Sequence, residues 1–546
     1  MRKRKLFTAV LILAVVIALI LSLAGCGQVA EEKNVLRVGM TREVESLNPM
    51  LVWSMQGYEV MMLNYNLLIS WDEDLNPIAN LARDWEADED GMLWTFYLHE
   101  DVTWHDGEPF TAEDVKFTFE YIRDSEEELG YFYDYVAGME EITVVDEHTV
   151  TIKTDEPLAW MPQIWVPILP KHIWEEIDQE FASSEFENED PVGTGPFRVI
   201  EHVQGQYTRL AANDQYFKGR PELDEVILIT YANADMMVEA LKRGELDIIT
   251  SVPAAQFKAL VDDAVPDIVT LAASSPSFSE LSFNVWEDAA SLGNPLLLDH
   301  AVREAFEYAI DRDHLIEVAF YGYGEFGTTL VPPLYDFWHL KLNDDEIRHF
   351  NPDKAKEILD NAGYAVGDNG VRVSADGVPL SFELLVRTES PDNQKAAMLI
   401  KEWLNTVGIE ITIGVIDEGT LTDRILESDF DMFIWGWYVD VDPTSILKIM
   451  TTDEIQSWSD CFYSNPEYDA MHLRQQRILD WDERQQMIFD MQRIVYDDIP
   501  YVLLSYDPEL QAYRTDKYEG WTRNPALGPV IYTNTVETYE RLQPNQ

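Results

Sequence analysis

The chain has 546 residues, with 100 Asp and Glu against 39 Lys and Arg, which gives a formal net charge of −61. This acid excess argues against nucleic acid as a partner, because a phosphate-binding surface needs positive charge. It also argues against broad docking on anionic lipid. Hydrophobic residues make up 46% of the chain and aromatic residues 12%, so we expect a large folded core. Two cysteines are too few for a disulfide scaffold.

The N-terminal segment has the pattern of a secretory signal. Four cationic residues at 2–5 precede an apolar run at 6–24, and the run ends in Leu23-Ala24-Gly25-Cys26. This ending resembles a bacterial lipobox, in which the cysteine thiol takes the lipid. We expect a signal peptide at 1–25, a lipid on Cys26 and a tether at 26–34, with an uncleaved membrane anchor as the alternative. The protein is then expected outside the cytoplasm, anchored to the bacterial membrane.

In the N-terminal half, strand and helix patterns alternate. Residues 36–39 and 94–98 are predicted strands. Thr111 and Asp114 form a capping box for a helix whose apolar stripe runs to Ile122. Residues 142–152 predict a hairpin that turns at Asp146 and Glu147.

The C-terminal half continues the same mixture. Predicted helices lie through 238–242, from Asp299, from Pro352 to Gly363, and over 393–404. Predicted strands follow at 246–250 and 407–415. Such mixed elements over 500 residues predict an α/β protein with at least two lobes.

Motifs for catalysis, metal binding and nucleotide binding are not found. The sequence has no His-Glu-x-x-His, no Cys-x-x-Cys, no nucleophile elbow and no phosphate-loop lysine. We therefore expect neither an enzyme nor a cofactor nor a metal site. After lipidation Cys26 is blocked, and Cys461 is expected to be a buried structural thiol.

Several motifs in a fixed order resemble the family 5 extracellular solute-binding proteins, the dipeptide- and oligopeptide-binding components of ABC importers. They are LRVGMTREVESLNP at 36–49, WHDGEP at 104–109 with AEDV at 112–115, PVGTGPFRV at 191–199, GRPELDEV at 219–226, AVREAFEYAIDRDHLI at 301–316, NPDKAKEILDNAGY at 351–364, GWYVDVDP at 436–443, SNPEYDAM at 464–471 and DERQQMIFDMQ at 482–492. The resemblance covers nearly all of the chain that follows the signal segment.

The resemblance implies a two-lobed clamp of mixed sheets flanked by helices, the large type II periplasmic-binding-protein fold. Lobe I would comprise 35–284 and 505–546, with a subdomain at about 73–190, and lobe II would comprise 285–504. Crossing segments near 282–284 and 503–505 would form the hinge, and closure about such a hinge captures the ligand.

The function implied is capture of oligopeptides or dipeptides and their delivery to a permease and ATPase complex by a monomeric binding protein. An oligosaccharide ligand, such as a cello-oligosaccharide, is the alternative within the same class of transporter. A secreted hydrolase is a remote third possibility. The sequence does not distinguish ligand length or the partner permease.

The resemblance also implies a charged pair of ligand contacts. A buried peptide zwitterion requires a fixed acid and a fixed base. In this family an acid just after the Gly-Trp of lobe II holds the peptide ammonium, and Asp440 occupies that place. Asp442 is the next acid, although Pro443 favours a turn role for it. Arg387 is the positional candidate for the ligand carboxylate, with a surface ion pair as the alternative.

Aromatic and polar residues complete the predicted site. Trp437 and Tyr438 lie at the end of a predicted strand, where they can line a cavity. Trp53 and Tyr58 follow the Ser-Leu-Asn-Pro motif and would face the cleft from lobe I. Asn284 at the crossing could bind ligand backbone or cap the hinge.

Overall fold

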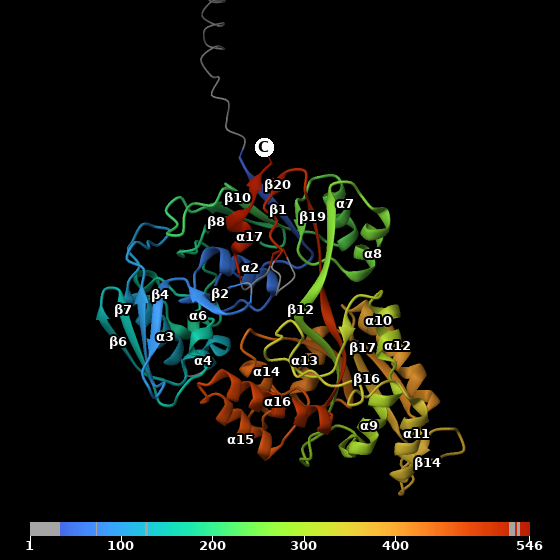
Figure 1. Cartoon of the computed structure of the whole chain (residues 1–546). Helices are drawn as coiled ribbons and strands as arrows, with labels where there is room; N and C mark the ends of the chain where they lie inside the picture. Colours follow the sequence, from blue (N-terminus) through green and yellow to red (C-terminus); the bar gives the residue numbers. More distant parts are fainter. Residues whose placement is uncertain (1–32, 73, 126–128, 524–529, 532–534, 546) are drawn as a thin grey trace, which may run out of the picture.

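The computed structural model describes residues 33–545 except 73, 126–128, 524–529 and 532–534. Figure 1 shows two bodies, one above the other, and a third part beside them that carries its own sheet. The signal segment at 1–25 and Cys26 lie outside the described residues.

Among the described residues, eleven strands form one sheet that runs through both bodies, in the order β17-β16-β18-β12-β19-β11-β1-β10-β9-β8 with β13 beside β19. Their bounds are β1 Val35–Met40, β8 Phe197–Val203, β9 Tyr207–Ala212, β10 Glu225–Thr230, β11 Ile248–Ile249, β12 Ile268–Phe283, β13 Glu325–Phe326, β16 Ser381–Arg387, β17 Glu410–Ile416, β18 Met432–Tyr438 and β19 Tyr501–Arg514. The mixed α/β class predicted from the sequence is confirmed.

The upper body contains β8 to β11 and β1, and helices cover its sheet (Figure 1). The helices labelled there are α2 Met55–Asn64, α7 Ala234–Lys242, α8 Ala254–Asp263 and α17 Glu537–Arg541. Leu36 and Val38 of β1 are fully buried on one face of the strand, whereas Arg37 on the other face is partly exposed. The short hairpin of β20 Tyr518–Glu519 and β21 Gln543–Pro544 lies near the C-terminus.

The subdomain is built on a second sheet of four strands, β4-β5-β7-β6. The elements of this part are β2 Ile69–Trp71, β3 Pro77–Ala79, β4 Ala82–Ala87, β5 Leu93–Leu98, α3 Ala112–Arg123, α4 Gly130–Val136, β6 Met139–Asp146, β7 Thr149–Thr154, α5 Lys171–Trp174 and α6 Gln179–Ala182. The predicted capping box of α3 is present, with Thr111 and Asp114 each bonding the other's backbone. Trp104 is almost fully buried and packs edge-on against Phe110 at 6.0 Å, so the recognisable 104–109 stretch has a structural role.

The lower body contains β16, β17 and β18 with flanking helices (Figure 1). Its elements include α9 His300–Ala309, α10 Arg312–Ala319, α11 Pro352–Asn361, β14 Ala365–Val366, β15 Arg372–Val373, α12 Pro391–Thr406, α13 Glu418–Leu426, α14 Thr444–Lys448, α15 Pro466–Gln475 and α16 Trp481–Asp498. Asp299 caps α9 and Pro352 opens α11, as the sequence predicts. The strand predicted from Val407 begins at Glu410, because the preceding Gly408 has a φ of +89° and still belongs to a turn.

The two bodies are joined by the long antiparallel pair β12 and β19. Their register runs from Ile268 opposite Arg514 to Ser282 opposite Tyr501. It shifts between Ser274 and Phe278 and again between Ser279 and Glu280. Pro276 and Pro508 lie at the first shift, and a proline removes a donor from a sheet ladder. The hydrogen-bond ladder between β12 and β19 is therefore interrupted close to residues 282–284 and 503–505, where the sequence predicts the crossing.

Candidate functional site

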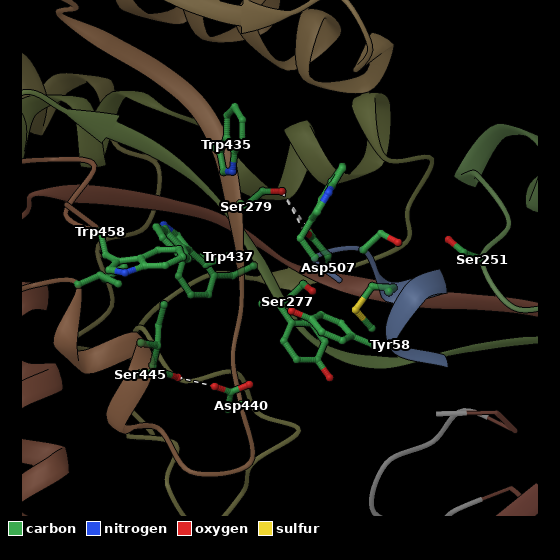
Figure 2. A pocket seen from close by; sticks show the side chains of 18 of the residues that line it. Tyr58, Ser251, Ser277, Ser279, Trp435, Trp437, Asp440, Ser445, Trp458 and Asp507 are labelled. Carbon is green, nitrogen blue, oxygen red and sulfur yellow. Dashed lines mark hydrogen bonds between the residues drawn. The ribbon is translucent and has the colours of Figure 1, made fainter. Parts of the chain in front are cut away.

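A cavity of about 930 Å³ lies where β12, β18 and β19 meet the segment around α2. This volume is near the upper end of the roughly 300–1,000 Å³ that is common for small-molecule sites. Figure 2 shows residues that line it, drawn from both bodies of the molecule. Asp440, Asp442, Arg387, Trp437, Tyr438, Trp53 and Tyr58 all line this cavity, so the structure brings seven of the eight predicted site residues together.

Aromatic rings form much of the wall. Tyr58 packs edge-on against Trp165 with 4.9 Å between ring centroids, and Tyr135 packs in the same way against Trp160 at 5.6 Å. All four rings line the cavity. Trp53 is 61% exposed, and it stands at the cavity with the Arg42 guanidinium 5.3 Å from its ring centre. Trp165, Tyr135 and Trp160 were not predicted, because they lie in the subdomain and carry no local signal of a binding role.

Asp440 follows the end of β18 and joins the two bodies across the cavity. Its Oδ2 accepts a hydrogen bond from Ser445 Oγ at 2.8 Å and one from the Tyr135 hydroxyl at 3.3 Å. Burial and then the negative charge of Asp440 raise the pKa of Tyr135 well above its ordinary value, so its phenol stays protonated and donates. Asp440 is therefore a carboxylate held in place by hydroxyl groups at the cavity surface.

Asp442 has a different environment from its neighbour. Arg484 donates from Nη1 to Asp442 Oδ2 at 2.6 Å and from Nη2 to Oδ1 at 2.7 Å. Thr444 adds hydrogen bonds to Oδ1 from its backbone N at 3.0 Å and its hydroxyl at 2.6 Å. Although burial alone would raise it, the pKa of Asp442 lies below its ordinary value because Arg484 stabilises the carboxylate. This carboxylate is satisfied within the protein.

Arg387 is also engaged by protein groups. It ends β16, and its Nη1 donates to Glu418 Oε2 at 2.8 Å while its guanidinium stacks 4.1 Å from the Trp435 ring centre. Glu418 lies 3.8 Å from Arg42 as well. The third cation of the lining, Lys448, contacts Asp134 and Glu454, each at 2.9 Å. Every cation of the described cavity lining thus has a carboxylate partner.

Asn284 lies outside the cavity lining. It is 2% exposed, and its Nδ2 donates to the carbonyls of Ser428 and Phe430 at 3.0 and 3.1 Å. Of the two roles predicted for it, binding ligand backbone or capping the chain at the crossing, these contacts fit the second.

Three buried or half-buried acids that lie near one another were not predicted, and Asp507 is the one of them that lines the cavity. Asp507 of β19 lines the cavity, and Ser279 Oγ donates to both of its carboxylate oxygens at 3.0 Å. Asp460 accepts from Trp437 Nε1 at 3.1 Å and also from Tyr501. Glu280 is fully buried. Burial raises the pKa of Asp507 and of Asp460 to about 6. The nearest sequence signal is the Ser505-Tyr506-Asp507-Pro508 end of a hydrophobic run, which is too common to indicate a site.

Three further observations on the described residues concern metal binding, the single thiol and membrane crossing. No group of three or more His, Cys, Asp or Glu side chains there is arranged to hold a metal ion. Cys461 is fully buried, and burial followed by the charge of Asp460 raises its thiol pKa, which leaves it unreactive. No helix within these residues combines the length and the apolar character that crossing a bilayer requires.

Comparison with known proteins agrees with this geometry. The family model described as "Bacterial extracellular solute-binding proteins, family 5 Middle" matches residues 76–457, which is most of the chain. The oligopeptide-binding protein AppA of Bacillus subtilis is 26% identical, covering 96% of this chain and 97% of its own. Its structure, solved in complex with a nonapeptide, superposes with a TM-score of 0.77 at 23% identity, covering 94% of this chain and 99% of the other.

A second solved structure has the same fold around a different ligand. NikZ from Campylobacter jejuni, in complex with Ni(L-His), superposes with a TM-score of 0.79 at 22% identity and covers 94% of this chain and 99% of its own. The fold is therefore that of a two-lobed solute-binding protein, and the family match decides the assignment. The chain belongs to the family 5 bacterial extracellular solute-binding proteins.

Proposed function

We propose that the protein is the substrate-binding component of an ABC importer and that it captures peptides outside the cytoplasm. The observation that carries this proposal is a carboxylate, Asp440, fixed by hydroxyl groups at the surface of an aromatic-walled cavity of about 930 Å³. The name of the Bacillus subtilis relative, an oligopeptide-binding protein, supports the same ligand class. The protein is proposed to bind and release its ligand without chemical change.

Asp440 is proposed to bind the ammonium group of the ligand. An ammonium ion loses its hydration on entering the cavity, so it requires a charged acceptor that is already oriented. The hydroxyl groups of Ser445 and Tyr135 supply that orientation. Trp437, Tyr438, Trp53 and Tyr58 are proposed to contact the apolar part of the ligand. Arg387 would bind a ligand carboxylate by exchanging its present partner Glu418.

Capture is proposed to occur by closure of the two bodies about β12 and β19, bending at the register shifts near Pro276 and Pro508. The lobes are then 35–284 with 505–546, carrying the subdomain at about 73–190, and 285–504. Contacts that cross the cavity support a closed arrangement: Lys448 meets Asp134 at 2.9 Å, and the Ala159 backbone N donates to the Gln476 carbonyl at 2.8 Å. A ligand that touches both bodies favours this state over an open one.

The N-terminal segment is proposed to export the chain and anchor it through a lipid on Cys26. The protein would work as a monomer beside a permease and its ATPase. Loss of membrane retention in Cys26→Ala, with the protein recovered in the soluble extracytoplasmic fraction, is the expected result. Unchanged membrane retention would contradict lipid anchoring and favour an uncleaved apolar anchor.

Calorimetric titration with free and N-acetylated peptides tests the ligand class. Removing one partner of a buried charge pair costs about 2–5 kcal/mol, so N-acetylation is expected to weaken binding at least about thirty-fold. The same loss is expected for Asp440→Asn with the free peptide. Asp376→Asn is the matched control, because it removes the same charge from an exposed turn outside the cavity lining. Equal binding of free and acetylated peptides would remove Asp440 from the site.

An oligosaccharide ligand is the second candidate, and the aromatic wall is the observation that favours it. A thermal-shift screen of peptides against cello-oligosaccharides separates the two, since a ligand that binds only the native state raises its apparent stability. Stabilisation by oligosaccharides and not by peptides would overturn the peptide proposal. Turnover of either ligand by the purified protein would show a hydrolase instead.

A further inference from the structure

We infer that the cavity holds a second binding point for positive charge at Asp507, next to the buried Glu280, and that the ligand is a peptide carrying a basic side chain in addition to its terminal ammonium. This inference rests on the proposed peptide-binding function and specifies the class of peptide. It concerns the end of the cavity that lies beyond Tyr58 from Asp440 in Figure 2.

Asp507 reaches the cavity without a cation beside it. Its carboxylate is held by Ser279 Oγ, at 3.0 Å from each oxygen, and by Ser505 Oγ at 2.8 Å from Oδ1. Among the described residues, the hydrogen-bond partners of the Asp507 carboxylate are these serine hydroxyl groups, and none of them is a cation. Hydroxyl groups orient a carboxylate but leave its charge uncompensated, so a cation arriving from the cavity gains a charge-assisted hydrogen bond.

Glu280 is the second observation, and it is independent of the hydrogen bonds around Asp507. It is 0% exposed, and neither of its carboxylate oxygens has a hydrogen-bond partner among the described atoms. Burial and then the charges of Asp460 and Asp507 raise the pKa of Glu280 well above its ordinary value. This shift holds the Glu280 carboxyl in its neutral form, although the charge of Arg387 opposes it, and a cation bound at Asp507 would lower the cost of a negative charge in this region. These acids are not arranged to hold a metal ion, which favours an organic cation.

The cations of the described cavity lining already lie beside carboxylates other than Asp507. Arg42 and Arg387 share Glu418, and Lys448 is paired with Asp134 and Glu454. None of these pairs includes Asp507, so a ligand whose own charges sum to zero would leave that carboxylate without a counter-charge. A ligand with an additional ammonium or guanidinium group fits both the charge of the site and its walls, because aromatic rings such as Trp437 attract cations and cover their aliphatic stems.

The strand register limits where the basic side chain lies along the ligand. Ser279, which holds Asp507, is paired with Gly436, and Asp440 lies four positions further along the same chain. At a rise of about 3.3 Å per residue, the two acids are separated by at most about 13 Å along the strand direction. An extended peptide bound through its ammonium at Asp440 covers that distance within its first four residues, which places the basic side chain at positions two to four.

Calorimetric titration with a scanned tetrapeptide set tests the inference. Each of positions two, three and four carries in turn lysine or norleucine, which has nearly the same shape without the charge. We expect the wild-type protein to prefer lysine by at least about tenfold at one position, and Asp507→Asn to reduce that ratio to about one. The ratio cancels any general loss of affinity in the variant, and Asp376→Asn should keep the wild-type ratio.

The possible outcomes distinguish this inference from the proposed peptide-binding function on which it rests. Equal affinity for lysine and norleucine at all three positions, or a lysine preference that survives Asp507→Asn, would overturn the second binding point while leaving peptide binding intact. Failure of every peptide to bind, while another class of ligand stabilises the protein, would overturn the proposed function itself. Because the lysine-to-norleucine comparison is made on the wild-type protein, a folding defect in the variant cannot hide a negative result.

Discussion

Two neighbouring aspartates are expected to respond in opposite ways to the same substitution. Asp440→Asn should weaken ligand binding with little effect on stability, whereas Asp442→Asn should destabilise the protein. The two residues lie two positions apart, so each variant is a control for the other. The physical difference between them is Arg484, which forms a two-point pair with Asp442.

The size of the effect follows from burial. The Arg484 side chain is 0% exposed and that of Asp442 is 6% exposed. The amide of asparagine offers one acceptor in place of a charged pair of oxygens, so the guanidinium stays buried without a counter-charge. Breaking such a pair from one side costs about 3–5 kcal/mol. At about 2–4 °C per kcal/mol for a lobe of this size, we expect the melting temperature to fall by about 10 °C.

Thermal melts followed by circular dichroism across a pH series provide the assay. The pKa of Asp442 is lowered in the folded state, so its stabilising contribution is fully present above its unfolded value of 3.8 and is lost as pH falls through the folded value. The gap between wild type and Asp442→Asn should therefore be large at pH 7 and close as the pH is taken below about 4. A gap of less than about 2 °C at pH 7, or one that widens on acidification, would refute the reasoning.

Three further predictions concern other parts of the molecule. Burial and then Glu59 raise the pKa of Glu509 to about 8, so Glu509→Gln should stabilise the protein at pH 8 and leave it unchanged at pH 4.5 in urea titrations; equal effects at both pH values would contradict the shift. Gly193→Ala should destabilise severely, since a Cβ there would lie 1.8 Å from the Asn64 carbonyl oxygen, whereas Gly419→Ala has no contact closer than 3.5 Å and should be tolerated in the same unfolding assay. Lys448→Met removes an ion pair that crosses the cavity and is worth about 0.2–1 kcal/mol; it should shift the ligand-free protein toward a larger radius of gyration in X-ray scattering, and an unchanged scattering profile would show that this pair does not hold the closed state.

Short-range features of the fold were predictable because their causes are local. The capping box at Thr111 requires only Asp114 three residues later, and the helix that opens at Pro352 is fixed by its first residues. The joining of both bodies by one sheet was not predictable in the same way. It depends on the pairing of β19 with β11 and with β12. Both of these strands lie more than two hundred residues before β19 in the chain. Pairings of that separation leave no periodic signal in either segment.

The same contrast between local and long-range causes explains which parts of the candidate site were predictable. The residues around Gly436 were predicted to line a cavity because one continuous motif carries them, and they line it together. The bidentate partner of Asp442 is 42 residues away, and Ser279, one of the two serines that hold Asp507, is 228 residues away. The sequence therefore indicated which acids to consider but not which of them are already neutralised by the protein. That distinction assigns Asp442 to the structure, whereas Asp440 and Asp507 remain the acids proposed to contact the ligand.

The pairing of the cations in the cavity lining shows how the large acid excess bears on ligand binding. A net charge of −61 spread over the surface does not select a ligand, since surface charges are screened within about 8 Å at physiological salt. Inside the cavity screening is weaker, and there Arg387 and Lys448 have carboxylate partners, while Asp507 is held by serine hydroxyl groups. The overall field then attracts positively charged peptides to the protein and speeds their encounter, and the uncompensated acids of the cavity retain those that bring their own positive charge. Both effects favour the same ligand, but only the second discriminates one peptide from another.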